Sequence, residues 1–225
     1  MDQNEKECGI RDITLGILAG GRSSRMGRDK ALLPWRGRPL AEHMGEQLAD
    51  CGSVLVSAAD ANQMRGIPYP VVADERRMYG PLEGIYRLLM AARTEWVFIV
   101  AADLPLVKSE LPKCLLKQLA AEEEKGATGR DEGRQIAAVV PCAHGRVHPL
   151  CGLYHKRAIP ILEELFAEGE HRVCALLDRL PAVYVMAGEH GLDLRMFANV
   201  NTPQEYEKLT EMEGMGYESS NYYSE

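Results

Sequence analysis

A glycine-rich segment with cationic side chains is the part of the sequence best suited to chemistry on phosphates. Residues 18–30 read Leu-Ala-Gly-Gly-Arg-Ser-Ser-Arg-Met-Gly-Arg-Asp-Lys, directly after an apolar run. Glycines let the backbone approach an anion and direct N–H groups at it, and Arg and Lys add charge-assisted hydrogen bonds. The segment is not a Walker A loop, because no Gly-Lys-Ser/Thr ends it. It is not a Rossmann fingerprint either, because Leu18 stands where that motif needs a glycine. It predicts a polyphosphate-binding loop, against the alternative of a basic loop without function.

Two acidic residues follow apolar segments further along the chain. Asp103 comes just after Trp96–Ala101, and Asp74 comes directly after Val71–Ala73. A carboxylate at the end of a buried strand is costly unless it is paired or bound to a metal. Because Mg2+ takes one or two carboxylates together with phosphate oxygens, Asp103 is predicted to hold this ion. The alternative for Asp103 is a structural role in a turn or helix cap.

The elements that must position these residues alternate between strands and helices. Continuous apolar runs are typical of parallel strands covered on both faces, and the alternation predicts an α/β fold with helices on both sides of the sheet. Ligands bind at the carboxyl ends of such strands, so the glycine loop and the two acids are expected to converge on one site. We expect strands at 13–18, 54–56, 71–73, 96–101, 137–140, 150–154 and 183–186, and helices at 39–51, 82–92, 109–121, 159–166, 172–180 and from 202 on.

Composition excludes several other classes of protein. The net charge of −7 offers no global basic face for nucleic acid. The longest apolar run, Trp96–Ala102, is far shorter than the about 20 residues of a membrane span, and the charged N-terminus lacks the apolar core of a signal peptide. The chain is therefore expected to be cytoplasmic, with one domain over 10–210 and an acidic, disordered tail over 211–225. The polar stretch 122–135 is expected to be a mobile loop.

Cysteine and histidine residues cluster in one short segment. Cys142, His144, His148 and Cys151 are ligand types that zinc prefers. Their spacing matches no familiar zinc motif, however, and Pro149 lies within the cluster. A loop that faces the substrate is the preferred interpretation, and the cysteines are expected to be small buried side chains or surface thiols without function.

Several motifs, in order, resemble one family. They are the glycine loop, Gly-Pro-Leu-Glu-Gly at 80–84, Asp-Leu-Pro at 103–105, His-Pro at 148–149, Gly-Glu-His-Arg-Val at 169–173 and Asn-Val-Asn-Thr-Pro at 199–203. In these motifs the chain resembles the molybdenum cofactor guanylyltransferases, the MobA family, over residues 10–210. The resemblance implies a three-layer α/β/α nucleotidyltransferase fold with a mostly parallel sheet. It also implies that GMP passes from GTP to molybdenum-molybdopterin with release of pyrophosphate, with Mg2+ (or Mn2+) as the cofactor.

The resemblance further implies a role for each matched position. Expected partners besides the two substrates are cofactor-biosynthesis proteins and acceptor molybdoenzymes. Arg25, Lys30 and Asp103 are the implied catalytic residues, with Lys30 on the phosphates and Asp103 on the metal. The residues implied to hold GTP are Leu18, Ala19, Gly20, Gly21, Lys30, Asp74, Gly80 and Asp103, and those implied for the pterin side are His148, Arg172, Asn199 and Asn201.

Some residues depart from the family pattern, and alternative functions stay open. Ser57 stands where some relatives carry an Asn that contacts the nucleotide, and the loop is one residue short between Gly27 and Asp29. One alternative is a cytidylyltransferase of the same fold, acting on molybdopterin or another small phosphate. Such relatives tend to read Leu-Ala-Ala-Gly, so Gly20 favours the guanine branch. The other alternative is a nucleotide-binding regulator without catalysis, which would not need Lys30 and Asp103.

Overall fold

A mixed sheet of eight strands forms the centre of the protein. This computed structural model describes residues 12–19, 30–35, 37–76, 78–128, 135–200 and 202–214. The strand order is β10-β7-β9-β6-β1-β4-β5, with β8 paired to β7, and β2 and β3 form a separate hairpin. The strands are β1 (Ile13–Leu18), β2 (Pro34–Trp35), β3 (Arg38–Pro39), β4 (Gly52–Ala58), β5 (Val71–Ala73), β6 (Trp96–Ala101), β7 (Ala138–Ala143), β8 (Arg146–Val147), β9 (Cys151–His155) and β10 (Ala182–Met186).

Most of the sheet is parallel, as the sequence predicts. β6, β1, β4 and β5 are parallel neighbours, and β10 is parallel to β7. β9 runs antiparallel between β6 and β7, which the sequence pattern does not reveal because strand direction is not a local property. The inserted β9 brings the segment that precedes it to the carboxyl end of β6, where the amide of Ala101 donates to the carbonyl of Leu150 at 2.9 Å.

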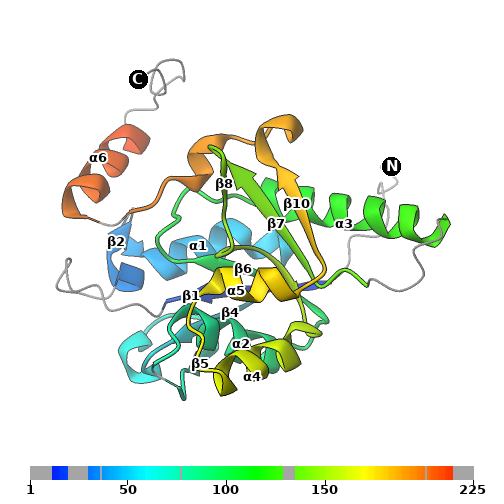
Figure 1. The fold of residues 1–225 in the computed structure, drawn as a ribbon. Helices are drawn as coiled ribbons and strands as arrows, with labels where there is room; N and C mark the ends of the chain where they lie inside the picture. Colours follow the sequence, from blue (N-terminus) through cyan, green and yellow to red (C-terminus); the bar gives the residue numbers. More distant parts are fainter. Residues whose placement is uncertain are drawn as a thin grey trace, which may run out of the picture.

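Helices cover both faces of the sheet. Two groups of buried side chains fill the spaces between the layers, one including α1 and α3 and the other including α2, α4 and α5 (Figure 1). Side chains alternate along β6 accordingly: Phe98 and Val100 enter the first group, and Val97 and Ile99 enter the second. The helices are α1 (Leu40–Leu48), α2 (Pro81–Ala91), α3 (Glu110–Thr128), α4 (Ala158–Ala167), α5 (Val173–Arg179) and α6 (Pro203–Gly214), with short 3-10 helices η1 (Lys30–Leu32), η2 (Ala49–Cys51), η3 (Ala61–Met64), η4 (Ala187–His190) and η5 (Leu194–Phe197).

The last helix has the start that its sequence predicts. The Thr202 hydroxyl accepts from the amide of Glu205 at 3.2 Å, and the Glu205 carboxylate accepts from the amide of Thr202 at 3.0 Å. This reciprocal pair satisfies two amides that the helix itself leaves unbonded. α6 continues to Gly214, and residues 215–225 of the expected tail lie outside the described residues. Within the described part of the chain, no helix combines the length and the apolar character that a bilayer span requires.

The loop predicted for residues 122–135 is wrong in its first half. α3 continues to Thr128, while residues 129–134 lie outside the described residues. Glu, Lys and Ala are strong helix formers, and Lys125 forms an ion pair with Glu122 one turn away at 2.6 Å. A polar composition here therefore marks an exposed helix surface.

Gly126 lies exposed inside this extension, and a Cβ there would meet no atom within 4 Å. We expect Gly126→Ala to stabilise the protein by about 0.5–1 kcal/mol, because Ala loses less backbone freedom in a helix. Thermal unfolding should show a Tm higher by roughly 1–4 °C. The same change at Gly84 in α2 is the matched comparison, since its Cβ would lie 2.6 Å from Leu18 Cδ2. An equal gain in both variants would contradict the argument.

Candidate active site

The carboxyl ends of four neighbouring parallel strands bring the predicted site segments together. Leu18 at the end of β1 pairs with Ser57 of β4 and with Ala101 of β6. Backbone hydrogen bonds continue beyond the strands. The amide of Ala19 donates to the carbonyl of Ser57 at 2.7 Å, and the amide of Asp74 donates to the carbonyl of Ala58 at 2.9 Å. We call the carboxyl ends of β6, β1, β4 and β5 the nucleotide edge, after the nucleotide that the family resemblance implies. Asp74 and Asp103 both follow strands that end at this edge, as the sequence predicts.

The glycine loop itself is described only at its two ends. Leu18 and Ala19 are buried at the end of β1, and the backbone of Lys30 begins η1. The expectations for Gly20, Gly21 and Arg25 lie outside the described residues, as does the expectation for Asn201.

Ser57 uses its hydroxyl within the protein. The side chain is 1% exposed and donates a hydrogen bond of 3.0 Å to Oδ1 of Asp74. Gly84 of α2 packs against the same atoms, because a Cβ there would lie 3.0 Å from the Ser57 hydroxyl and closer still to Leu18. Ser57 therefore orients Asp74 within the protein.

Burial raises the pKa of the Asp74 carboxyl, as does the charge of Glu83, while the hydrogen bond from Ser57 and the charge of Arg87 oppose the rise. The folded state therefore holds this proton more tightly than the unfolded chain, so the stability contributed by the group falls as pH rises through the folded pKa. We expect Asp74→Asn to raise Tm at pH 7, because the variant removes the charge that burial disfavours. The gain should vanish below about pH 4, where the unfolded carboxyl is also protonated. Thermal unfolding of both proteins between pH 3.5 and 8 measures this, and a pH-independent difference would contradict it.

The connection between β5 and α2, residues 74–80, forms a strap beside the nucleotide edge. Gly80 ends the strap with φ of +52°, a conformation that favours glycine. The Tyr79 phenol donates to the carbonyl of Phe166 at 2.6 Å, and the Tyr79 ring lies 4.8 Å from that of His171. The strap thus packs against the end of α4 and against the connection from α4 to α5. Arg77 lies outside the described residues.

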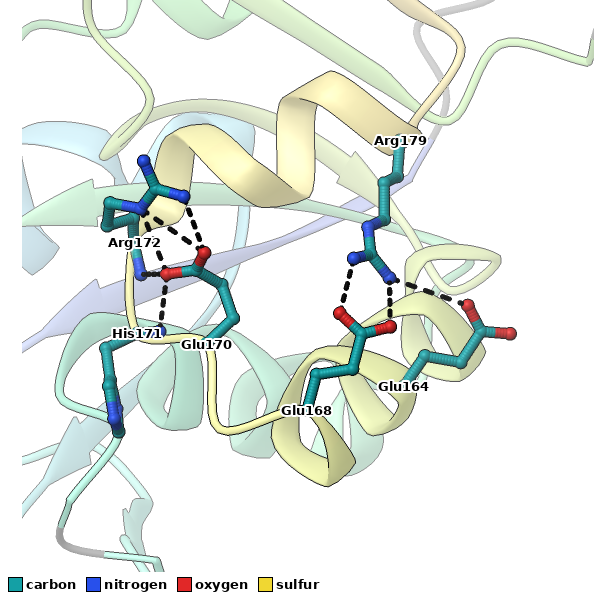
Figure 2. Close-up of polar contacts among 6 residues, drawn as sticks. All are labelled: Glu164, Glu168, Glu170, His171, Arg172 and Arg179. Carbon is teal, nitrogen blue, oxygen red and sulfur yellow. Dashed lines mark hydrogen bonds and ion pairs between the residues drawn. The ribbon is translucent and has the colours of Figure 1, made fainter.

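Arg172 stands on that connection, at the start of α5. Its guanidinium donates to both oxygens of the Glu170 carboxylate, at 3.1 Å and 2.7 Å, and the backbone amides of His171 and Arg172 add two further bonds to the same group (Figure 2). These bonds lower the pKa of Glu170 to about 2. Through the contact of His171 with Tyr79, the structure brings the exposed Arg172 to the same neighbourhood as Gly80.

Asp103 lies where β6, β9 and the segment before α6 meet. Its carbonyl accepts from the amide of Val200 at 2.8 Å, which places Asn199 and Asp103 on adjoining segments. The pKa of the buried Cys151 thiol is raised by burial and by the charge of Asp103. In the part of the chain that the structure describes, no group of three or more His, Cys, Asp or Glu side chains is arranged to hold a metal ion.

His148 is held from several sides. Its amide donates to the carbonyl of Pro141 at 2.9 Å, Nε2–H donates to that of Ala143 at 3.3 Å, and its ring lies 4.6 Å from the ring of Phe197. Burial lowers the pKa of His148, so the neutral ring is favoured. Because the carbonyl of His148 accepts from Cys151, the first residue of β9, the ring stands near the carboxyl end of β6.

Comparison with known proteins shows the family to which this chain belongs. The family model for the MobA-like NTP transferase domain matches residues 15–183, which include the glycine loop, the strap, Asp103 and α5. The chain belongs to the MobA-like NTP transferase family. It is 33% identical over 206 residues to a probable molybdenum cofactor guanylyltransferase of Carboxydothermus hydrogenoformans, covering 89% of this chain and 96% of the relative. It is 34% identical to the molybdenum cofactor guanylyltransferase of Vibrio cholerae, covering 86% and 89%.

Solved structures confirm the nucleotidyltransferase fold expected for a member of the MobA-like family. Molybdopterin-guanine dinucleotide biosynthesis protein A of Archaeoglobus fulgidus superimposes with a TM-score of 0.72 at 23% identity, over 90% of this chain and all of that one. The 2-C-methyl-D-erythritol 4-phosphate cytidylyltransferase of Thermus thermophilus gives a TM-score of 0.61 at 20% identity, over 91% and 99%. At these sequence identities, the structural similarity shows a shared fold and nothing about function.

Proposed function

We propose that this protein transfers GMP from GTP to molybdenum-molybdopterin and releases pyrophosphate. The observation that carries the proposal is the likeness, at 30–35% identity over most of the chain, to relatives named molybdenum cofactor guanylyltransferases. The convergence of Ala19, Asp74 and Asp103 at the nucleotide edge supports it, since this is where ligands bind in α/β sheets.

In the proposed reaction an oxygen of the terminal phosphate of molybdopterin attacks the α-phosphorus of GTP in line, and pyrophosphate leaves. The protein needs no covalent nucleophile, because positioning two mutually repelling anions and stabilising charge supply the rate. Backbone amides of the glycine loop, with Arg25 and Lys30, draw the phosphate charge onto the protein. GTP is held by Leu18, Ala19, Gly20, Gly21, Asp74 and Gly80, and the pterin by His148, Arg172, Asn199 and Asn201.

The donor set at Asp103 suits Mg2+, or Mn2+ in its place. A single carboxylate at the nucleotide edge is sufficient, because Mg2+ completes its coordination with phosphate oxygens and water. When bound, the ion would neutralise phosphate charge and polarise the α-phosphoryl group. Asp103 would hold the ion, and its backbone is fixed by the hydrogen bond from Val200.

Thermal unfolding with GTP, CTP, ATP and UTP, each with and without Mg2+, tests the nucleotide. A ligand at a hundredfold its Kd adds about 2.7 kcal/mol, which raises Tm by roughly 5–11 °C here. We expect a GTP-selective rise that Mg2+ enhances, followed by pyrophosphate release once molybdenum-molybdopterin is added. A CTP-selective rise would indicate the cytidylyltransferase, and GTP binding without pyrophosphate release would indicate a regulator. No rise with any nucleotide would contradict the proposal.

A further inference from the structure

Glu83 is a buried acid to which the proposed reaction gives no role. It occupies the third position of α2 and is 0% exposed. A Glu at this position commonly bonds the amide of the residue that caps its own helix. Here its carboxylate instead accepts from the amides of Glu75 and Arg76, at 3.0 Å and 3.3 Å, and from the Arg76 guanidinium at 3.2 Å. The side chain therefore reaches from the helix to the opposite end of the strap.

These contacts compensate a charge that would otherwise be costly in the interior. A buried carboxylate is tolerated when a cation and several donors satisfy it. Arg76 is itself fixed, because its guanidinium lies 4.9 Å from the ring centres of both Tyr86 and Phe166. Glu83 thus joins α2, the strap and α4 around one buried charge.

The bonds made by Glu83 fall on the two residues that follow Asp74 in the chain. Asp74 is held on its other side by the carbonyl of Ala58 and by the hydroxyl of Ser57. The direction of the Asp74 carboxylate consequently depends on both Ser57 and Glu83.

We propose that Glu83 is a positioning residue for the nucleotide site: its carboxylate fixes the strap so that Asp74 is presented to the bound nucleotide. The inference rests on the proposed function, which places the nucleotide at this edge. The Glu83 carboxylate bonds Glu75 and Arg76 of the strap and acts on the nucleotide site through Asp74.

A double-mutant cycle on nucleotide affinity tests this role. Glu83→Ala should weaken GTP binding about tenfold, and Glu83→Gln should weaken it less, because the amide oxygen still accepts from the two backbone amides. Within an Asp74→Ala background, Glu83→Ala should cost less than a further twofold, because the residue through which it acts is already lost. Ile85→Val, a buried change on the same helix, should leave GTP affinity within twofold while also lowering Tm.

Additive losses in the cycle, or an unchanged GTP Kd in Glu83→Ala, would overturn the role. If the wild type binds CTP in place of GTP, the same cycle with CTP decides, although the guanylyltransferase proposal has then failed. If the wild type binds no nucleotide, amide hydrogen exchange at Glu75 and Arg76 decides. Exchange at least tenfold faster in Glu83→Ala than in Ile85→Val supports the part of the proposal in which Glu83 fixes the strap, and equal exchange overturns it.

Discussion

Asp103→Asn is expected to reduce pyrophosphate release at least about 1,000-fold and to leave the fold intact. The amide keeps the shape of the side chain but removes the negative charge with which Asp103 would hold Mg2+, and this charge stabilisation is worth several kcal/mol in the transition state. The backbone bond between Asp103 and Val200 does not involve the side chain and is kept in the variant, and thermal unfolding of the variant checks that the fold is intact. Turnover measured as a function of Mg2+ concentration gives the result.

The matched control for Asp103→Asn is Asp50→Asn. Asp50 is an exposed carboxylate, paired with Lys113, on the short helix that precedes β4, at the opposite edge of the sheet. Such exposed pairs contribute about 0.2–1 kcal/mol, and turnover should be unchanged. Near-normal Mg2+-dependent turnover in Asp103→Asn would remove Asp103 from the metal site.

Gly52→Ala is expected to lower stability by about 3 kcal/mol without changing the site. A Cβ on Gly52 would lie 2.0 Å from the carbonyl oxygen of Ile13, its partner in β1. Relief requires the backbone of two paired strands to separate, and overpacking of this kind costs about 1–3 kcal/mol or more. Thermal unfolding should show a Tm lower by roughly 6–12 °C, and the folded variant should keep its kcat because Gly52 begins β4 and the nucleotide edge lies at its other end.

Gly188→Ala serves as the comparison for Gly52→Ala. Gly188 is exposed in η4, and a Cβ there would meet no atom within 4 Å, so its Tm should stay within about 2 °C of the wild type. An equally small change of Tm in Gly52→Ala would contradict the prediction, because it would mean that β1 and β4 can separate at little cost in stability.

Gly52 also shows where local patterns mislead. In the sequence it stands directly after the helix predicted for 39–51, where a left-handed glycine often ends a helix. In the structure α1 ends at Leu48, a short 3-10 helix follows, and Gly52 is extended as the first residue of β4. Glycine is required at this position for a different reason, because the carbonyl of Ile13 approaches it closely. No pattern of neighbouring residues in the sequence reveals this approach.

The strand segments Trp96–Ala101 and Val71–Ala73 match β6 and β5 residue for residue. The prediction of β6 succeeds because burial on both faces imposes an uninterrupted apolar run that any short window reveals. β5, at the edge of the sheet, is only partly buried. The positions of Asp74 and Asp103 after strand ends can likewise be read from neighbouring residues in the sequence. Their convergence then follows from a general property of parallel sheets.

The sequence alone thus determined the α/β class, the family and the segments that meet at the nucleotide edge. Only the tertiary structure decided that the Ser57 hydroxyl is bonded to Asp74, that Glu83 holds the strap, and that the antiparallel β9 brings Leu150 beside β6. The physical reason is the range of each interaction. Periodicity and turn chemistry act between near neighbours in the chain, whereas strand register and the reach of a buried carboxylate are set by segments that meet only when the chain is folded.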